Sequence, residues 1–214
     1  MAGQVVMDKS AKFWDKIAEK YSRQPVADEA AYQKKLKKTQ AYFRPDMEVL
    51  ELGCGTGSTA IVHAPFVRHI RATDISPEML RIGKAKADAQ GLGNITFECA
   101  SVDDLKIPER SLDMVMAHSI LHLLEEKEVV IGRVFDMLKP GGLFVSSTAC
   151  LGDVMWFLKP VIPVMRLFGK APRVVKFFTA RQLLNGLAEA GFEIDYQWQP
   201  GKTGALFVVA KKPV

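Results

Sequence analysis

The sequence predicts an α/β fold, a doubly wound and mostly parallel sheet of seven strands, and three observations lead to this prediction. From about residue 47 to residue 150, short apolar runs alternate with longer amphipathic stretches, as in repeated strand–helix units. A cluster of glycines follows the first of these runs. Two further apolar runs close the chain, separated by residues 200–204, which are few enough for a hairpin turn. The last two strands should therefore form an antiparallel edge.

Each predicted element has its own local signal. The strands are the short apolar runs, expected at 47–52, 67–73, 94–99, 112–117, 143–150, 192–199 and 205–210. Ser76 suits an N-cap and Pro77 suits a first helical turn, so together they open a helix that runs to about Gly91. A second helix is expected over 125–138, ending at a Lys-Pro-Gly-Gly turn. A third should cover 179–190, with Thr179 as its cap.

Composition and charge indicate the class of protein. The 214 residues are 48% apolar and 25% charged, which is average for a globular domain and excludes a disordered or collagen-like chain. The net charge of +5 could favour an anionic partner or could serve solubility alone. Cys54, Cys99 and Cys150 form no CxxC or Cys/His cluster, so neither a disulfide framework nor a structural zinc site is expected. Without a secretory signal or a run of about 18 apolar residues, we expect a cytoplasmic protein.

The most informative segment is the glycine loop within residues 49–58, which reads VLELGCGTGS. Glycines at 53, 55 and 57 let the chain turn sharply and bring bare backbone against a ligand. Their GxGxG spacing differs from the GxGxxG of dinucleotide sites, and Glu51 suits an ammonium or sulfonium group better than a pyrophosphate. Asp74, at the end of the second strand, can accept hydrogen bonds from both hydroxyls of a ribose. This pattern predicts a nucleoside ligand, with a purely structural turn as the weaker alternative.

These features resemble the class I S-adenosylmethionine-dependent methyltransferases, specifically the small-molecule enzymes of the type 11 group. Four segments match the family's motifs in order, and the resemblance covers about residues 10–150. They are ELGCGTG at 51–57, ATDISPEML at 72–80, SLDMVMAHSILHLL at 111–124 and LKPGGLFVSS at 138–147. The resemblance implies a Rossmann-like fold and S-adenosyl-L-methionine as cofactor. It also implies methyl transfer to O, N or S of a small acceptor.

Carried over position by position, the resemblance implies a set of cofactor-binding residues. Glu51 and the three loop glycines would hold the methionine portion, Asp74 the ribose and Ile75 the adenine. Cys54, between the glycines, is interpreted as a packing residue. The full set of cofactor-binding candidates is Tyr21, Glu51, Gly53, Cys54, Gly55, Gly57, Asp74, Ile75, Met79, Ser101, Val102 and His118.

Two of these assignments depart from the family or have an equal alternative. Ser101 stands where the family usually has an Asp for the adenine amine, and the backbone of Val102 can read the ring edge. Tyr21 matches a tyrosine that often lies over the carboxylate of the cofactor. An aromatic core contact would explain Tyr21 equally well.

The loop after the fourth strand should face the reacting methyl group, because ligands bind at the carboxyl ends of parallel strands. His118, Ser119 and His122 lie in this loop. His118 is the first candidate for a catalytic base and His122 the second, while simple packing in the pocket explains either histidine as well. A base is needed only for an acceptor that arrives protonated. No acidic third ligand is near, so no metal site is expected.

We expect one domain over 1–214 with four parts. These are N-terminal cap helices (9–43), a cofactor-binding core (44–150), a lid or substrate insertion (151–178), and a C-terminal helix with the edge hairpin (179–214). The insertion combines many aromatic and aliphatic side chains with five cations. It could cover a partly apolar acceptor pocket or meet an anionic membrane. The lysine run within 34–38 is interpreted as a solvated helix face.

Alternatives stay open at this point. Among enzymes, they are a phospholipid-headgroup or lipid-quinone methyltransferase that docks on a membrane through 151–178, and a nicotinamide-dependent dehydrogenase. A different class is a cofactor-binding module without catalysis. Nucleic-acid methylation has only the net charge in its favour. We expect a monomer or a homodimer.

Overall fold

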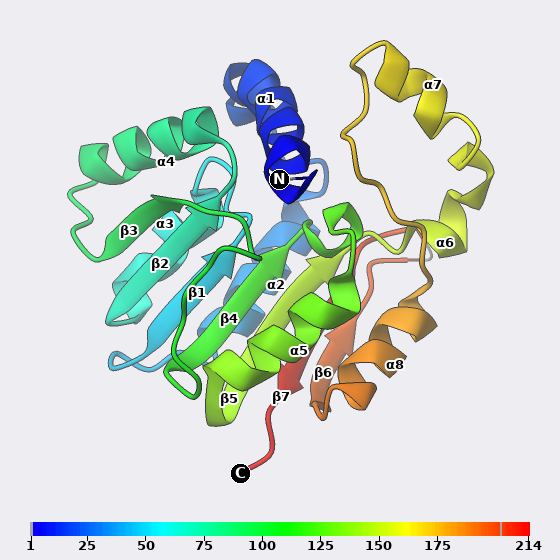
Figure 1. The fold of residues 1–214 in the computed structure, drawn as a ribbon. Helices are drawn as coiled ribbons and strands as arrows, with labels where there is room; N and C mark the ends of the chain where they lie inside the picture. Colours follow the sequence, from blue (N-terminus) through cyan, green and yellow to red (C-terminus); the bar gives the residue numbers. More distant parts are fainter. Residues whose placement is uncertain (1, 202) are drawn as a thin grey trace.

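A sheet with the strand order β3-β2-β1-β4-β5-β7-β6 lies at the centre of the protein (Figure 1). The computed structural model describes residues 2–201 and 203–214, so Met1 and the predicted turn residue Lys202 lie outside it. Strands β1 to β5 run parallel, and β7 is antiparallel to both β5 and β6, as predicted. Their bounds are β1 Glu48–Leu52, β2 His69–Asp74, β3 Ile95–Cys99, β4 Leu112–His118, β5 Leu138–Thr148, β6 Glu193–Trp198 and β7 Leu206–Lys211.

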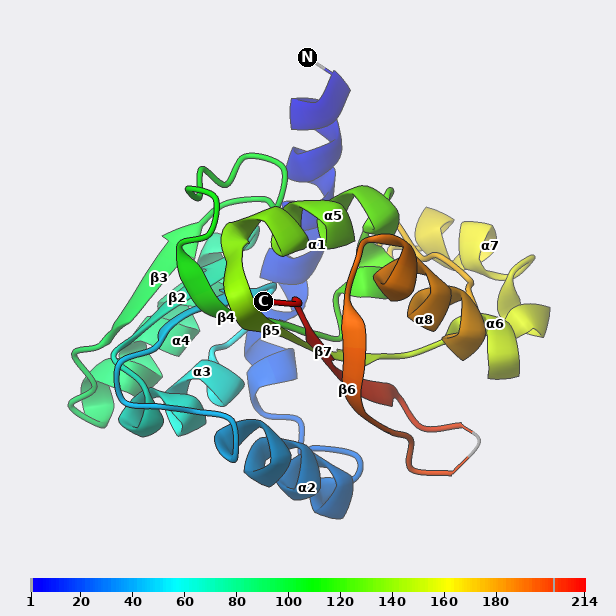
Figure 2. The ribbon, with the colours of Figure 1, turned by 90° about the horizontal axis from the view of Figure 1, so that it is seen from below.

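Helices cover both faces of the sheet (Figure 2). Helices α5 (Lys127–Met137) and α8 (Ala180–Glu189) pack on one face, and α2 (Glu29–Gln40), α3 (Ser58–His63) and α4 (Pro77–Ala89) lie on the other. Because both faces are covered, β4 is buried along almost its whole length, as in other parallel sheets. The doubly wound α/β prediction is confirmed.

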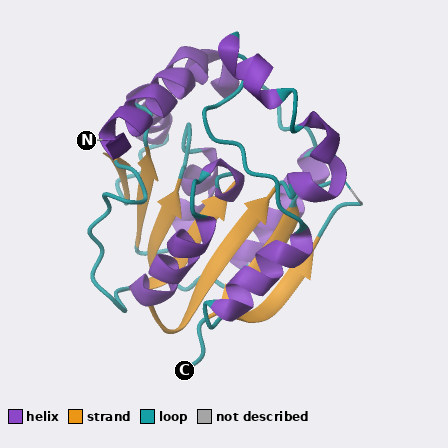
Figure 3. Cartoon of the chain, turned by 45° about the vertical axis from the view of Figure 1, so that its right-hand side comes forward, coloured by secondary structure: helices purple, strands orange, loops and turns teal. Residues whose placement is uncertain are grey.

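The remaining helices lie over the carboxyl ends of the parallel strands (Figures 1 and 3). They are α1 (Ala2–Ser22) and, in the insertion, α6 (Leu151–Val154) and α7 (Ile162–Leu167). Within the described residues, no helix combines the length and the apolar character needed to cross a bilayer.

The predicted helix caps are confirmed. The Ser76 hydroxyl accepts a hydrogen bond from the backbone of Met79 at 3.2 Å, which caps α4. Thr179 and Gln182 form a reciprocal capping box at the start of α8. Helix α4 ends at Ala89, two residues before the left-handed Gly91.

The Lys-Pro-Gly-Gly segment was expected to be a turn, and this prediction is wrong. Strand β5 already begins at Leu138 and continues through this segment. The amide of Gly141 donates to the Lys212 carbonyl, and the Lys212 amide donates to the Gly142 carbonyl, both at 2.9 Å. Pairing with the chain's C-terminal stretch therefore keeps the segment in the sheet. Gly141 is left-handed (φ 77°), and the pairing of β5 with β4 shifts register here, from Leu138 opposite Leu112 to Leu143 opposite Met114, so the irregularity bulges out of β5.

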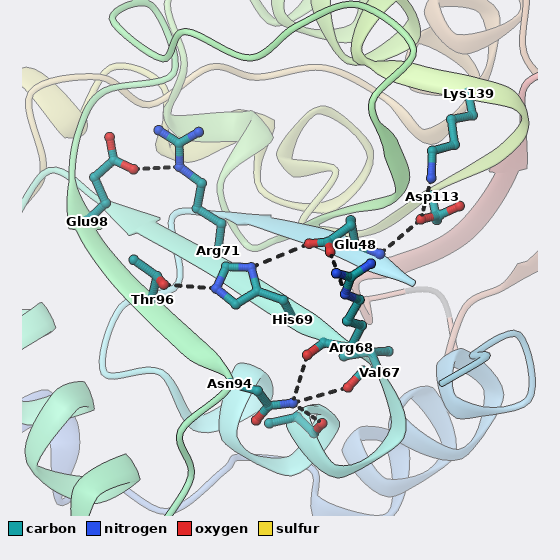
Figure 4. Close-up of polar contacts among 11 residues, drawn as sticks. Glu48, Val67, Arg68, His69, Arg71, Asn94, Thr96, Glu98, Asp113 and Lys139 are labelled. Atoms are coloured by element: carbon teal, nitrogen blue, oxygen red, sulfur yellow. Dashed lines mark hydrogen bonds and ion pairs between the residues drawn. The ribbon is translucent and has the colours of Figure 1, made fainter. Parts of the chain in front are cut away.

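Polar side chains join the amino ends of the strands, opposite the end that carries the site (Figure 4). The Asp113 carboxylate accepts from the Glu48 amide at 2.9 Å and from Lys139 Nζ at 2.8 Å. The Asn94 side chain donates to the Val67 carbonyl at 3.1 Å. These contacts connect β1, β4 and β5 to one another and the start of β3 to the loop before β2. The carboxyl ends are left open for a ligand.

Candidate functional site

A pocket of about 780 Å³ opens at the carboxyl ends of β1, β4 and β5. Its walls are the glycine loop after β1, the α1–α2 segment, the ends of β4 and β5, and the loop before β7. The position agrees with the rule that open α/β sheets bind ligands outside the carboxyl ends of their strands.

The glycine loop is a turn that only glycines accommodate easily. Gly53, Gly55 and Gly57 all have left-handed backbone angles, with φ of 62°, 54° and 70°. A Cβ on Gly53 would collide with the side chain of Ile120, which follows β4 and covers this part of the loop. The amide of Cys54 donates to the Thr73 carbonyl of β2 at 2.9 Å. The loop is therefore held against β2 with bare backbone on the pocket side.

Glu51 brings a carboxyl group into the pocket without a counter-charge. Its side chain is only 2% exposed, and Oε2 has no hydrogen-bond partner among the described residues. Burial raises the pKa of Glu51 to about 8; the nearby Asp74 charge adds to the rise, and a backbone hydrogen bond from Ala60 opposes it. An unsatisfied buried carboxyl is costly, and an ammonium or sulfonium ligand would satisfy it.

Asp74 connects the end of β2 to the loop. Its Oδ2 accepts from the Gly55 amide and its Oδ1 from the Ser76 amide, each at 2.9 Å. Each carboxylate oxygen keeps a further lone pair. Two oxygens oriented in this way suit the vicinal hydroxyls of a ribose. Glu51, the glycine loop and Asp74 thus fit a nucleoside that carries a cationic group.

Helix α1 closes the pocket from above. The ring of Tyr21 lies against the loop, 3.9 Å from the position that a Cβ of Gly55 would take. Asp15 accepts a hydrogen bond from the Ser76 hydroxyl and so holds α1 to the start of α4. Met79 packs in the same interface against Ala18, with its side chain 2% exposed. Tyr21 therefore faces the pocket, whereas Met79 is part of the packing beneath it.

The residues assigned to the adenine lie beyond this pocket. The Ser101 hydroxyl donates to Asp104 Oδ2 at 2.7 Å and accepts from the Asp104 amide at 3.2 Å. Val102 is 8% exposed. Neither these residues nor Ile75 is among those that line the 780 Å³ pocket. Their contact with the adenine stays a prediction.

The two candidate histidines have different positions. His118 ends β4 and lines the pocket, and its Nε2 is buried without a partner among the described residues. Burial lowers the pKa of His118 to about 4, and the charge of Lys35 contributes. His122 lies in a short 3₁₀ turn, Leu121–Leu123, outside the pocket lining. Burial also lowers the pKa of His122. Of the two candidates, His118 alone lines the pocket, where it faces a ligand as a neutral imidazole.

Lys35, His63 and Ser147 also line the pocket, although no sequence motif singled them out. Lys35 Nζ donates to the Ser147 hydroxyl at 2.9 Å, so the interpretation of the lysine run as a fully solvated face is wrong at this position. The signal that could have found it is helical spacing. Lys35 lies four residues from the buried Ala31 and from the buried Thr39, on the inner face of α2.

The insertion, 151–178, contributes no residue to the 780 Å³ pocket. Part of it lines a separate groove of about 660 Å³ with α5 and α8. Several large apolar side chains project into solvent, with exposed fractions of 68% for Trp156, 83% for Leu167 and 70% for Phe168. Its role as a lid stays a prediction.

Comparison with known proteins points to methyltransferases. Residues 49–142 match the family model for a methyltransferase domain. An uncharacterized methyltransferase, YcgJ of Bacillus subtilis, is 27% identical over 105 residues, 49% of this chain and 42% of the relative. The ubiquinone/menaquinone biosynthesis C-methyltransferase UbiE of Vibrio cholerae is 28% identical over 130 residues, 58% of this chain and 47% of the relative. The chain thus spans about half the length of these curated relatives.

Solved structures share the fold. A putative S-adenosylmethionine-dependent methyltransferase from Listeria monocytogenes superposes with a TM-score of 0.73 at 20% identity, covering 86% of this chain and 98% of that one. The structure of Bacillus YcgJ gives a TM-score of 0.70 at 15% identity, covering 85% and 99%. At such identities the likeness establishes the architecture alone.

Glu51 makes a prediction about stability and pH. The pKa of Glu51 is about 8 in the folded protein against an ordinary 4.5, so the folded protein holds the proton more tightly than the unfolded chain does. Through this group, the free energy of unfolding of the ligand-free protein should fall as the pH rises from about 5 to 8, by at most about 1.4 kcal/mol per pH unit. Urea denaturation across this range should show a steeper fall for the wild type than for Glu51→Gln. Parallel pH profiles for the two proteins would contradict the assignment.

Proposed function

Because the chain belongs to the class I S-adenosylmethionine-dependent methyltransferases, we propose that it methylates a small, partly apolar acceptor held over the carboxyl ends of β4 and β5. S-adenosyl-L-methionine is its cofactor. The observation that carries the proposal is the buried carboxyl of Glu51, whose Oε2 has no hydrogen-bond partner among the described residues and which lines the pocket beside a loop of left-handed glycines. The acceptor atom was expected to be O, N or S, and the UbiE relative, named a C-methyltransferase, adds carbon to this set.

Different residues of the chain bind the cofactor and exclude water from it. When bound, the cofactor supplies a methyl group on a positively charged sulfur, which is already an activated electrophile. Glu51 accepts hydrogen bonds from the cationic amino group, and Asp74 accepts them from the ribose hydroxyls. Tyr21 and Ile120 cover the loop and exclude water. The protein must then orient a nucleophile in line with the methyl group, and this orientation alone can lower the activation barrier by several kcal/mol.

His118 is the candidate base. Its buried Nε2 has no hydrogen-bond partner among the described residues, and a pKa of about 4 keeps the imidazole neutral at physiological pH. A neutral nitrogen at the end of β4 can receive the proton of a hydroxyl or ammonium acceptor. His122 lies outside the pocket lining and is the weaker candidate.

A second candidate function, methylation of a lipid quinone by a protein docked on a membrane, rests on a separate observation. The insertion exposes Trp156, Leu167 and Phe168 and carries the cations Lys159 and Arg166 on the same short segment. Exposed aromatic and aliphatic side chains among cations suit an anionic bilayer surface. The UbiE relative is named for ubiquinone and menaquinone biosynthesis, which is consistent with such an acceptor.

Methyl transfer is the direct test of the first proposal. The wild-type protein should move labelled methyl from S-adenosyl-L-methionine to at least one member of a panel of phenols, thiols, amines and lipids. Scintillation counting of the extracted acceptors measures the product. Binding of the cofactor without product from any acceptor would instead favour a cofactor-binding module without catalysis.

Asp74→Ala should weaken the binding of S-adenosylhomocysteine by about 1–3 kcal/mol, because the ribose loses its hydrogen bonds and the loop loses the Gly55 contact. Isothermal titration calorimetry measures the change. Asp103→Ala removes an exposed carboxylate near the same edge of the sheet and should leave the affinity unaltered. Equal affinities for Asp74→Ala and wild type would show that Asp74 does not hold the ribose.

Membrane docking has its own test. The wild type should co-sediment with vesicles that contain anionic lipid, and added salt should weaken this binding. The double variant Leu167→Ser/Phe168→Ser should bind less. Val129→Ser, which alters an exposed side chain on α5, should bind like the wild type. Binding that ignores lipid charge, salt and the insertion would reject this candidate.

A further inference from the structure

Lys35 places a positive charge inside the pocket without a negative partner in contact. The side chain is half-buried, and its ammonium donates to the hydroxyl of Ser147 at 2.9 Å. No ion pair joins Lys35 to a carboxylate among the described residues; Asp28 acts on it only through its field and caps α2 with its own oxygen. Burial lowers the pKa of Lys35. A partly desolvated ammonium of this kind is costly unless a ligand completes its contacts.

The sheet register places this charge away from the cofactor loop. Leu52 of β1 pairs with Ala117 of β4, so Gly53 lies at the level of His118. His118 pairs in turn with Ser147 of β5. Adjacent strands are about 4.8 Å apart, so the Lys35–Ser147 contact lies about 10 Å from the strand that carries the glycine loop. It therefore belongs to the part of the pocket beyond His118, where an acceptor would lie.

Apart from Asp28, which acts on Lys35 through its field, the groups near Lys35 are neutral hydrogen-bonding groups and apolar side chains. His63 is fully buried, and neither of its ring nitrogens has a partner among the described residues. Burial lowers the pKa of His63 to about 3, so it faces the pocket as a neutral imidazole, like His118. Leu36 and Ala205 contribute apolar surface to the same pocket. A ligand with an apolar ring and one ionised oxygen would fit these surroundings, because the oxygen would contact Lys35 and the ring would pack on the apolar side chains.

We propose that Lys35 and Ser147 bind an ionised hydroxyl of the acceptor, so the acceptor is a phenol or an enol. This inference rests on the proposed function and specifies its substrate class. The oxyanion accepts hydrogen bonds from Lys35 Nζ and from the Ser147 hydroxyl, in the manner of a charge-assisted pair. For an acceptor bound in this way the hydroxyl proton leaves to solvent on binding, so His118 has no proton to receive during methyl transfer. The ring rests on the apolar wall beside His118.

The probe for this site is 4-nitrophenol, whose absorption moves to longer wavelength when the hydroxyl ionises. It is titrated into protein saturated with S-adenosylhomocysteine, at a pH where the free phenol is mostly neutral. The wild type should produce saturable phenolate absorbance. Lys35→Met should weaken this signal at least tenfold, and Ser147→Ala should weaken it less. Lys37→Met, on the exposed side of the same helix, should match the wild type.

Calorimetry with S-adenosylhomocysteine on each variant separates the failure of this inference from the failure of the proposed function. All four proteins should bind it equally well, which also shows that they are folded. No phenolate signal with the wild type, or an equal signal with Lys35→Met, would overturn the inference while leaving the cofactor site intact. A tenfold loss of S-adenosylhomocysteine affinity in Lys35→Met would overturn it too, because Lys35 would then serve the cofactor. A wild type that does not bind S-adenosylhomocysteine would refute the proposed function itself.

Discussion

Burial of the Glu51 carboxyl where β1 ends determines what the site can bind. Burial raises the pKa of Glu51 to about 8 and leaves Oε2 without a hydrogen-bond partner among the described residues, and a cationic ligand would satisfy it. The loop that follows must leave room for that ligand, and its left-handed glycines expose backbone instead of side chains. Asp74 then fixes the loop through the Gly55 amide, and Asp15 brings α1 down onto the same corner through Ser76. Each step positions the next.

The two halves of the pocket have opposite charge preferences. At β1, the Glu51 carboxyl and bare backbone line the pocket and suit a ligand with a cationic group, and Asp74 lies next to this half, bonded to the Gly55 amide. At β4 and β5, a lysine, a serine hydroxyl and neutral imidazoles suit an electron-rich acceptor. Under the proposed function the electrophile and its nucleophile would lie over neighbouring strands, and His118 lies between the two halves. Orientation of this kind is the main contribution that a protein can make to the transfer of an already activated methyl group.

Much of this arrangement could be predicted from the sequence, because local signals determine it. The glycine spacing, the acids before and after it and the Ser76 cap are each visible within a few residues; the glycine turn and the Ser76 cap form as expected, and the roles of the two acids stay predictions. Contacts between distant segments were not visible. The Pro-Gly-Gly segment stays in β5 because Lys212, 70 residues later, pairs with it. Lys35 turns inward because β5 offers it the Ser147 hydroxyl, whereas its neighbour Lys34 lies over the Trp198 ring. Identical lysines in one run give no sign of this difference.

We infer that the glycine loop, Glu51 and Asp74 bind a sulfur-bearing nucleoside instead of a dinucleotide. Calorimetric titration of the purified protein with S-adenosylhomocysteine and, separately, with NADH tests it most directly. We expect saturable one-to-one binding of S-adenosylhomocysteine and no heat with NADH beyond dilution. Saturable binding of NADH together with a flat titration of S-adenosylhomocysteine would contradict it.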